Sequence, residues 1–210
     1  MKKFELTTDT TMLLGRKLFR IKALISFGNI KEGDLGGYVE KEKNLSHDGD
    51  AWVYGNAKVY GNAKVYGNAW VYDNAKVYDN AKVYDNAEVY DNAEVCGDAV
   101  VCGDAVVCGD AVVCGDAWVY DNARVCGNAK VCGDADYLCF KGLGSKNRNI
   151  TFFKCKDGHI HVSCGCFSGN LDAFEKKVKK THGDSKYAKE YLACVEVVKI
   201  HFEAGGDNNA

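Results

Sequence analysis

The chain of 210 residues is 47% hydrophobic and 27% charged, and its formal net charge is −2. This balance excludes disorder as the default and is typical of a globular protein of one or two domains. The sequence has no run of about 18 apolar residues, and its first 19 residues are too polar for a signal peptide. We therefore expect a cytoplasmic protein without a membrane partner.

Cysteine content and charge distribution add two expectations. The chain has 11 cysteines, and in a cytoplasmic protein these thiols should stay reduced. Residues 51–136 carry six basic and thirteen acidic side chains, a net charge of −7, whereas residues 137–210 carry twelve and eight, a net charge of +4. An acidic segment followed by a basic one favours charge-steered association with a partner or with further copies of the chain.

Residues 1–50 are expected to form an N-terminal cap and an irregular first coil. Residues 19–23 alternate in polarity as a strand does, and residues 33–37 are rich in glycine and predict a turn. The irregular coil is expected around Val39 and Leu45. The following His47 falls where the register of the later repeats places an inward aliphatic residue.

Residues 51–136 repeat one six-residue unit, [Gly/Asp]-[Asn/Asp]-Ala-x-Val-[Tyr/Cys], without insertion or deletion. Fifteen alanines from Ala51 to Ala135 and fourteen valines from Val53 to Val131 keep the same spacing. Alternation along Ala-x-Val-Tyr predicts a strand with alanine and valine inside, and the polar pair that follows predicts a corner. Three units make an 18-residue triangular lap, and laps spaced by about 4.8 Å give a shaft of about 23 Å.

The units from Val59 to Lys64 and their neighbours resemble hexapeptide repeats of left-handed β-helix proteins. The segment before them is similar to the entry segment of an acyltransferase-like group found in bacteria and their phages. This resemblance implies an all-β solenoid with a left-handed triangular β-helix of 18 residues per coil, and commonly a homotrimer. In such acyltransferases a catalytic histidine lies on a coil, whereas here the regular coils contain no histidine and His47 alone lies near them.

After the repeats, residues 137–146 are expected to be a linker and residues 147–204 a small α+β module. Two alternating segments flank Lys156-Asp157-Gly158, which predicts a hairpin, and apolar residues at helical spacing follow it. We expect a ββαα order and a disordered tail over residues 205–210. The module resembles a small C-terminal module of the same bacterial and phage group.

One group of cysteines and histidines in this module has the residue types of a metal site. It contains Cys155, His159, His161, Cys164, Cys166 and His182. A structural zinc site normally shows pairs such as C-x-x-C, whereas the pairs here are separated by a single residue. The alternative is a hairpin with buried thiols and exposed imidazoles, so we expect no metal.

The outward positions of the laps supply the expected contact surfaces. Stacking by 18 residues predicts columns of aromatic side chains near the N-terminal end, which either stabilise the shaft or bind a ligand or partner. The candidate binding residues are Trp52, Tyr54, Tyr60, Tyr66, Trp70, Tyr72, Tyr78, Tyr84 and Tyr90. An outward apolar group further along predicts an interface of a homo-oligomer, with a trimer favoured. It consists of Val100, Val106, Val112, Cys108 and Cys114.

The sequence therefore favours a binding or scaffold protein without catalytic residues or a cofactor. Its ligand is expected to be a nucleotide-like small molecule or a protein partner. The alternatives are a coenzyme A-dependent acyltransferase with His47 as the base, a purely structural rod, and an acidic mimic of DNA. The lysines at 58, 64, 76 and 82 count against the last of these.

Overall fold

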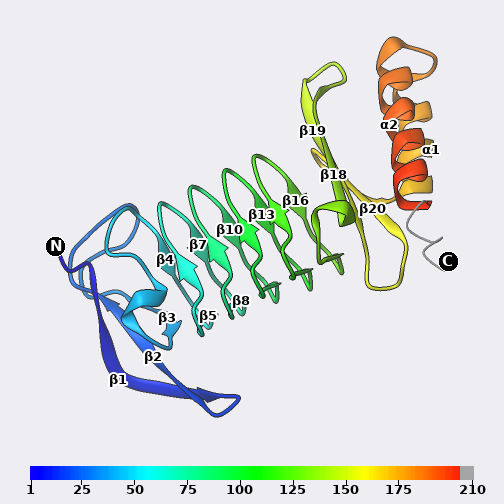
Figure 1. The fold of residues 1–210 in the computed structure, drawn as a ribbon. Helices are drawn as coiled ribbons and strands as arrows, with labels where there is room; N and C mark the ends of the chain where they lie inside the picture. Colours follow the sequence, from blue (N-terminus) through cyan, green and yellow to red (C-terminus); the bar gives the residue numbers. More distant parts are fainter. Residues whose placement is uncertain (204–210) are drawn as a thin grey trace.

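The computed structural model describes residues 1–203, and the expected tail at 205–210 lies outside these residues. Three parts follow one another along an elongated molecule: an N-terminal cap, a shaft of stacked laps, and a C-terminal module (Figure 1). The shaft comprises residues 51–132. Its laps rise from the cap at one end to the module at the other, so residues 1–50 lie far from the C-terminal module.

The shaft consists of fourteen two-residue strands. They are β4 Trp52–Val53, β5 Lys58–Val59, β6 Lys64–Val65, β7 Trp70–Val71, β8 Lys76–Val77, β9 Lys82–Val83, β10 Glu88–Val89, β11 Glu94–Val95, β12 Val100–Val101, β13 Val106–Val107, β14 Val112–Val113, β15 Trp118–Val119, β16 Arg124–Val125 and β17 Lys130–Val131. Every third strand pairs in parallel, so that Val53 lies beside Val71 and Val59 beside Val77. The predicted lap of 18 residues is confirmed.

Three parallel sheets form the faces of the shaft. The first face is β4-β7-β10-β13-β16 and the third is β6-β9-β12-β15. The second is β3-β5-β8-β11-β14-β17, in which β3 is Leu35–Val39 of the N-terminal cap. The repeat alanines up to Ala129 and all fourteen repeat valines are at most 1% exposed, which confirms that both point inward. The repeat itself ends earlier than predicted, because Ala135 is exposed and lies in the short 3-10 helix η2, Asp134–Asp136.

A core of alanine and valine leaves no space for a larger side chain. Ala93 is 0% exposed and lies in the middle of the shaft. We expect Ala93→Leu to destabilise the protein by about 1–3 kcal/mol, because a well-packed interior must shift to accept additional methylene groups. Urea unfolding of the two proteins measures this difference, with the solvent-facing substitution Lys64→Leu on the same shaft as the control. Equal unfolding midpoints for Ala93→Leu and the unmodified chain would contradict the inward placement.

The corners are held by backbone conformation and by side-chain amides. The first corner residue has positive φ, which glycine adopts without strain and aspartate tolerates, as at Gly55 (63°) and Asp73 (57°). The second corner residue joins neighbouring laps, since Asn74 donates to Asn92 (3.3 Å) and Asn92 donates to Asp110 (3.1 Å). A carboxylate accepts hydrogen bonds and does not donate them, so Asp104 accepts from Asn86 on one side and from Asn122 on the other.

The N-terminal cap is a three-stranded antiparallel sheet that continues the second face. Its strands are β1 Phe4–Leu13, β2 Arg16–Ala23 and β3 Leu35–Val39, followed by the 3-10 helix η1 Glu42–Asn44. Val39 pairs with Val59 and Leu45 with Val65, so the first lap is two residues longer than the others. Leu45 therefore takes the inward position that the sequence register assigned to His47.

Donors from the cap satisfy the carbonyl groups at the first edge of the shaft. The Lys3 ammonium is 1% exposed and donates to the carbonyls of Gly49 (3.0 Å) and Ala51 (2.8 Å). Burial lowers the pKa of Lys3 to about 8, although Asp50 and Asp48 act in the opposite direction. Asn44 donates its amide to the Ala63 carbonyl at 2.8 Å. These contacts close an edge that would otherwise pair with other chains.

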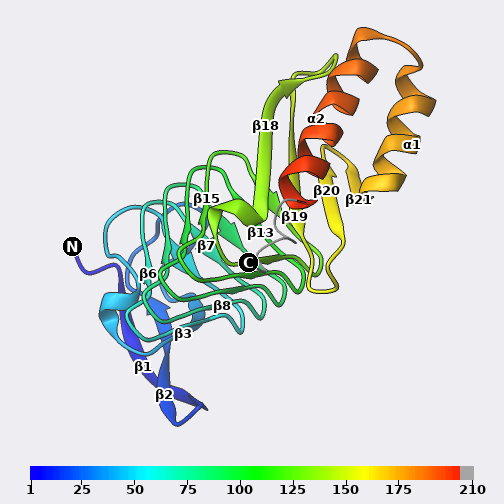
Figure 2. The same ribbon diagram turned by 45° about the vertical axis from the view of Figure 1, so that its right-hand side comes forward.

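The C-terminal module closes the other end. It contains an antiparallel sheet of β18 Tyr137–Leu143, β19 Arg148–Lys154, β20 Ile160–Cys164 and β21 Phe167–Asn170, and two helices, α1 Leu171–His182 and α2 Lys186–Glu203. Residues 137–143 are thus a strand of the module rather than a linker, and the order is ββββαα rather than ββαα. The sheet lies between the end of the shaft and the helices (Figures 1 and 2).

Successive side chains of β19 point alternately into two different cores. Phe153 and Cys155 pack into the core of the shaft, whereas Ile150 and Phe152 pack with the helices. The Thr151 hydroxyl accepts from the Arg124 amide (3.2 Å) at the last lap. The module is therefore the second cap of the shaft and not a separate appended domain. Neither helix has the length and apolar content needed to cross a lipid bilayer.

Candidate functional site

Outward side chains stack in columns along each face, as the 18-residue lap requires. The ring centroids of Tyr60 and Tyr78 are 5.0 Å apart, and those of Tyr66 and Tyr84 are 4.8 Å apart, with nearly parallel planes in both pairs. Tyr72 and Tyr90 form a third pair at 4.8 Å. Such stacks stabilise adjacent strands, so most of these rings have a structural role whether or not they also bind a ligand.

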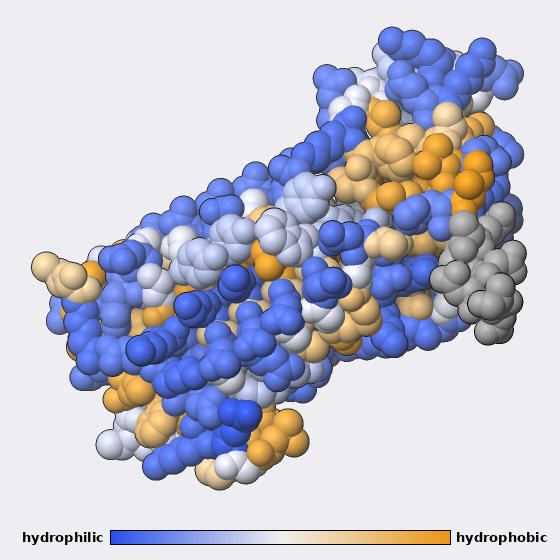
Figure 3. All heavy atoms as spheres, viewed as in Figure 1, coloured by the Kyte–Doolittle hydropathy of each residue, from blue (hydrophilic) through white to orange (hydrophobic). Residues whose placement is uncertain are grey.

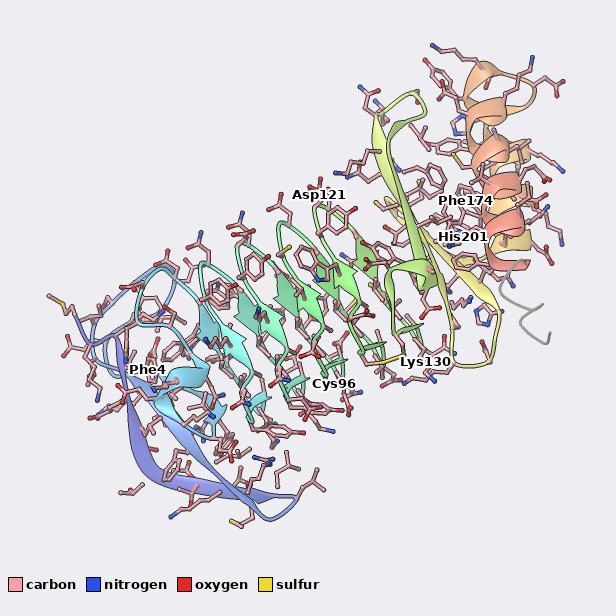
Figure 4. The ribbon with its side chains drawn as sticks, in the orientation of Figure 1. Phe4, Cys96, Asp121, Lys130, Phe174 and His201 are labelled. Atoms are coloured by element: carbon pink, nitrogen blue, oxygen red, sulfur yellow. A yellow bond between two sulfur atoms is a disulfide. The ribbon has the colours of Figure 1, made fainter. Side chains whose placement is uncertain are left out.

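Two of the predicted binding residues are not available to a ligand. Trp52 is 0% exposed because the N-terminal cap covers it, with its ring 5.3 Å from Phe27 and 6.3 Å from Phe4. Tyr60 is 5% exposed, and its ring stacks on that of Tyr78. Phe4 lies inside the cap close to the first laps (Figure 4). The prediction that these two side chains face a ligand is therefore wrong, and for Trp52 the cause is burial by cap residues that are distant in the sequence.

The other predicted binding residues are exposed to different degrees. Tyr54 is 50% exposed. The remaining six are half-buried, namely Tyr66, Trp70, Tyr72, Tyr78, Tyr84 and Tyr90. Hydrogen bonds hold several of their phenols, since Tyr72 donates to Glu88 and Tyr78 donates to Glu94, both at 3.0 Å.

The predicted apolar interface is smaller than its sequence suggested. Val100 is 4% exposed and Cys108 is 6% exposed within the single chain, whereas Val106 and Val112 are half-buried. Val100 lies between Lys82 and Trp118 of neighbouring laps, so larger residues flank it on both sides. Hydrophobic residues gather instead over the C-terminal module and at the tip of the β1–β2 hairpin (Figure 3).

The cysteine columns contain one disulfide. Cys114 and Cys132, one lap apart on the second face, are bonded to each other. This bond contradicts the expectation that every thiol is reduced. Cys96 precedes them in the same column, at the lower edge of the shaft in Figure 4, and is a free cysteine.

A hollow lies at the N-terminal end of the third face. Its volume is about 1300 Å³, and its lining includes the lysines at 41, 43, 64 and 82 together with Ser46 and Tyr66. The longer first lap creates this space. The Ser46 amide donates to the Val65 carbonyl (2.9 Å) as the Tyr66 amide does to Val83 one lap later (3.1 Å). Ser46 thus occupies the place in the column where a further tyrosine would stack on Tyr66.

The charge of the hollow is positive. Its lining has four lysines against the carboxylates of Glu42 and Asp48. Glu42 is paired with His47 (2.8 Å) and Lys2 (3.3 Å), and these hydrogen bonds lower the pKa of its carboxyl. Within residues 1–203, Lys43, Lys64 and Lys82 form no ion pair. The arrangement is suited to an anion that also carries a flat ring.

Residues 57–73 match a family described as YdcK Beta solenoid repeat. The matched segment lies within the regular laps, and the rest of the shaft continues the same repeat and geometry. The chain is a β-solenoid repeat protein. No curated protein matches it.

His47, the histidine beside the first laps of this β-solenoid, is held on both ring nitrogens. Nδ1 of His47 accepts from the Lys3 amide (3.2 Å), so Nε2 carries the proton toward Glu42 (2.8 Å). The ring also stacks on Phe4 at 4.4 Å. A general base needs a nitrogen that is free to accept the proton of the acceptor substrate. The geometry of His47 gives no support to the acyltransferase alternative.

The residues of metal-ligand type in the module separate into two groups. Cys155, His159 and His161 each place one ligand atom within 4.8 Å of the others. Cys164 instead packs in the core between the sheet and the helices. Cys166 and His182 do not join the cluster in the described part of the chain. The single-residue spacing that counted against a metal does not prevent three donors from converging.

Proposed function

We propose that this β-solenoid is a binding protein, not an enzyme, and that it holds a nucleotide-like molecule in the hollow of the third face. The observation that carries the proposal is the interrupted tyrosine column. Tyr66 stacks on Tyr84 on one side, and on the other side Ser46 leaves room beside its ring. A base would continue this stack, and the surrounding lysines would pair with its phosphate groups.

The rigidity of the shaft supports this assignment. Tyr66 and Tyr84 are fixed by the lap register and by their own contact, so a ligand would bind without the cost of ordering these rings. Lys64 and Lys82 come from the same two laps, and they are register partners in the adjacent strands β6 and β9. The base and phosphate contacts would thus come from neighbouring residues of one face.

Calorimetric titration with AMP, ADP and cyclic nucleotides tests the proposal. We expect Tyr66→Leu to weaken binding by about 1–3 kcal/mol, the range for loss of one base–aromatic stack. Tyr120 belongs to the same column at the opposite end and is 50% exposed. Tyr120→Leu should therefore leave the affinity unchanged.

Salt and nucleoside controls separate the two contacts. Adenosine should bind more weakly than AMP, and added salt should reduce the affinity for AMP, because the lysine contacts are electrostatic. No measurable binding of any nucleotide, or equal affinity of the Tyr66→Leu and Tyr120→Leu proteins, would exclude the proposal.

Self-association of the shaft remains a prediction. Val106 and Val112 still offer half-buried apolar side chains, but Val100 and Cys108 no longer support an extensive outer interface. Light scattering in solution measures the oligomeric state directly. A trimer would agree with the resemblance to hexapeptide-repeat proteins, and a monomer would leave nucleotide binding unaffected because the hollow is built from one chain.

A further inference from the structure

Three metal-ligand side chains meet where the module contacts the last laps of the shaft. One donor atom each from Cys155, His159 and His161 lies within 4.8 Å of the other two. The hairpin between β19 and β20 brings them together. The Cys155 amide donates to the His159 carbonyl (2.9 Å), and Phe153 pairs with His161. Because side chains alternate along a strand, these positions share the face of the sheet turned toward the shaft.

The hairpin is fixed against the shaft. Cys155 is 5% exposed and bridges Ala129 of the last lap. The amide of Lys156 donates to the Asn128 carbonyl at 3.1 Å, and its ammonium donates to the Asp110 carbonyl at 2.6 Å. The hairpin lies beside Lys130, at the end of the shaft in Figure 4. The backbone that carries the three donors is therefore positioned before any ligand binds.

Each histidine has an oxygen partner on one ring nitrogen. Nδ1 of His159 pairs with the carboxylate of Asp157, whose other oxygen accepts from the Asn128 amide group at 3.4 Å. Nε2 of His161 lies 2.8 Å from the Ser168 hydroxyl, and its ring stacks on Phe153. These contacts leave Nε2 of His159 and Nδ1 of His161 for coordination. Oxygen partners of this kind orient the histidine ligands of metal sites.

We propose that Cys155, His159 and His161 form a zinc site with a fourth position open to water. A donor set of one sulfur and two imidazole nitrogens suits Zn²⁺, whereas Ca²⁺ and Mg²⁺ bind oxygen ligands. Tetrahedral zinc holds such donors about 3.3–3.6 Å apart. Donor atoms that lie within 4.8 Å of one another reach these separations through movements of up to about 1.5 Å, and His159 is partly exposed.

The site would have a definite effect on the fold. Cys155 belongs to the core of the shaft, while His159 and His161 belong to the other arm of the hairpin. A shared zinc ion would join the two arms of this hairpin beside Ala129 of the last lap, and it would stabilise the cap in proportion to metal occupancy. This role is independent of nucleotide binding at the other end of the shaft.

Cobalt and zinc titration of the chelator-treated, reduced chain tests the site. We expect Co²⁺ to produce a thiolate-to-cobalt charge-transfer band that saturates at one ion per chain and disappears when Zn²⁺ is added. His159→Gln should weaken zinc binding by more than about tenfold. Asp157→Asn should weaken it by about 10–100-fold through the orientation of His159.

Two further variants keep the result interpretable. Cys166→Ser is the matched control, since Cys166 is exposed and outside the cluster, and it should leave the charge-transfer band unchanged. Cys155→Ser should remove the band, and circular dichroism checks that this buried substitution still folds. A band that persists in both His159→Gln and Cys155→Ser, or no cobalt binding by the unmodified chain, would overturn the proposal.

Discussion

The free energy of unfolding should fall steeply as the pH rises above about 10. Stacked tyrosines cause this loss. Burial raises the pKa of Tyr60 and that of Tyr90 to about 12, and a hydrogen bond with Cys102, followed by burial, raises that of Tyr84 to about 12. Burial also raises the pKa values of Tyr72 and Tyr78. In the folded shaft these phenols stay protonated when free tyrosine ionises.

The direction of the pH effect follows from proton binding. An unfolded tyrosine loses its proton near pH 10. Above this pH the unfolded chain binds fewer protons than the native chain, so the free energy of unfolding decreases as the pH increases. The stabilising contribution is complete below pH 10 and is lost as the pH rises through the folded pKa values. Each strongly shifted phenol adds at most about 1.4 kcal/mol per pH unit, and water reduces this for the half-exposed rings.

Urea unfolding followed by circular dichroism from pH 8 to 11.5 measures this decline. Tyr60→Phe removes one titrating phenol while keeping the ring that stacks on Tyr78, so it should make the decline shallower. Tyr120→Phe is the matched control at an exposed ring and should leave the slope as it is. An unfolding midpoint that stays constant from pH 9 to 11.5 would contradict the assignment.

The shaft was predictable because its structure is local and periodic. Each unit repeats the same strand, corner and inward pair, and three units make the 18-residue lap that places Val53, Val71 and Val89 in one row. The columns of tyrosine and cysteine follow from this register without further information. Sequence reasoning is reliable here because every lap has the same neighbours.

The ends of the shaft were predicted less well because their contacts are not local. Trp52 occupies an outward position of the repeat, yet it is buried because the distant Phe4 and Phe27 lie over it. The stretch Gly142-Leu143-Gly144-Ser145 is typical of a short linker, yet residues 137–143 pair with β19 over the end of the shaft. Two additional residues in the first lap place Leu45, not His47, in the core.

Both candidate sites depend on such irregularities. The hollow exists because the longer first lap places Ser46 next to Tyr66 in the column. The spacing of the repeat does not show where the two additional residues are accommodated. For the metal cluster the sequence contained a usable signal. Cys155-x-x-x-His159-x-His161 surrounds a predicted turn, and a tight hairpin places its two arms with these side chains on one face. The usual ligand spacings of structural zinc sites, such as C-x-x-C, do not include this arrangement.

Phe153→Ala should be among the most destabilising single substitutions in the chain. Phe153 is 0% exposed and closes the end of the shaft core, so truncation leaves a cavity beneath the module. Loss of a buried phenylalanine typically costs about 3–5 kcal/mol. Urea unfolding should show a loss in this range, and Phe153→Leu, which retains most of the volume, should lose less than half as much.

The neighbouring Phe152 provides a control of equal size on the opposite face of β19. Phe152 is also 0% exposed, but it packs edge-on against Phe174 in the core between the sheet and the helices. Hydrogen exchange separates the two effects. Phe153→Ala should increase exchange in β16 and β17, the strands that the module covers, whereas Phe152→Ala should increase it in α1 and α2. If both substitutions loosened only the helices, the module would not stabilise the last laps, and its assignment as the second cap would be wrong.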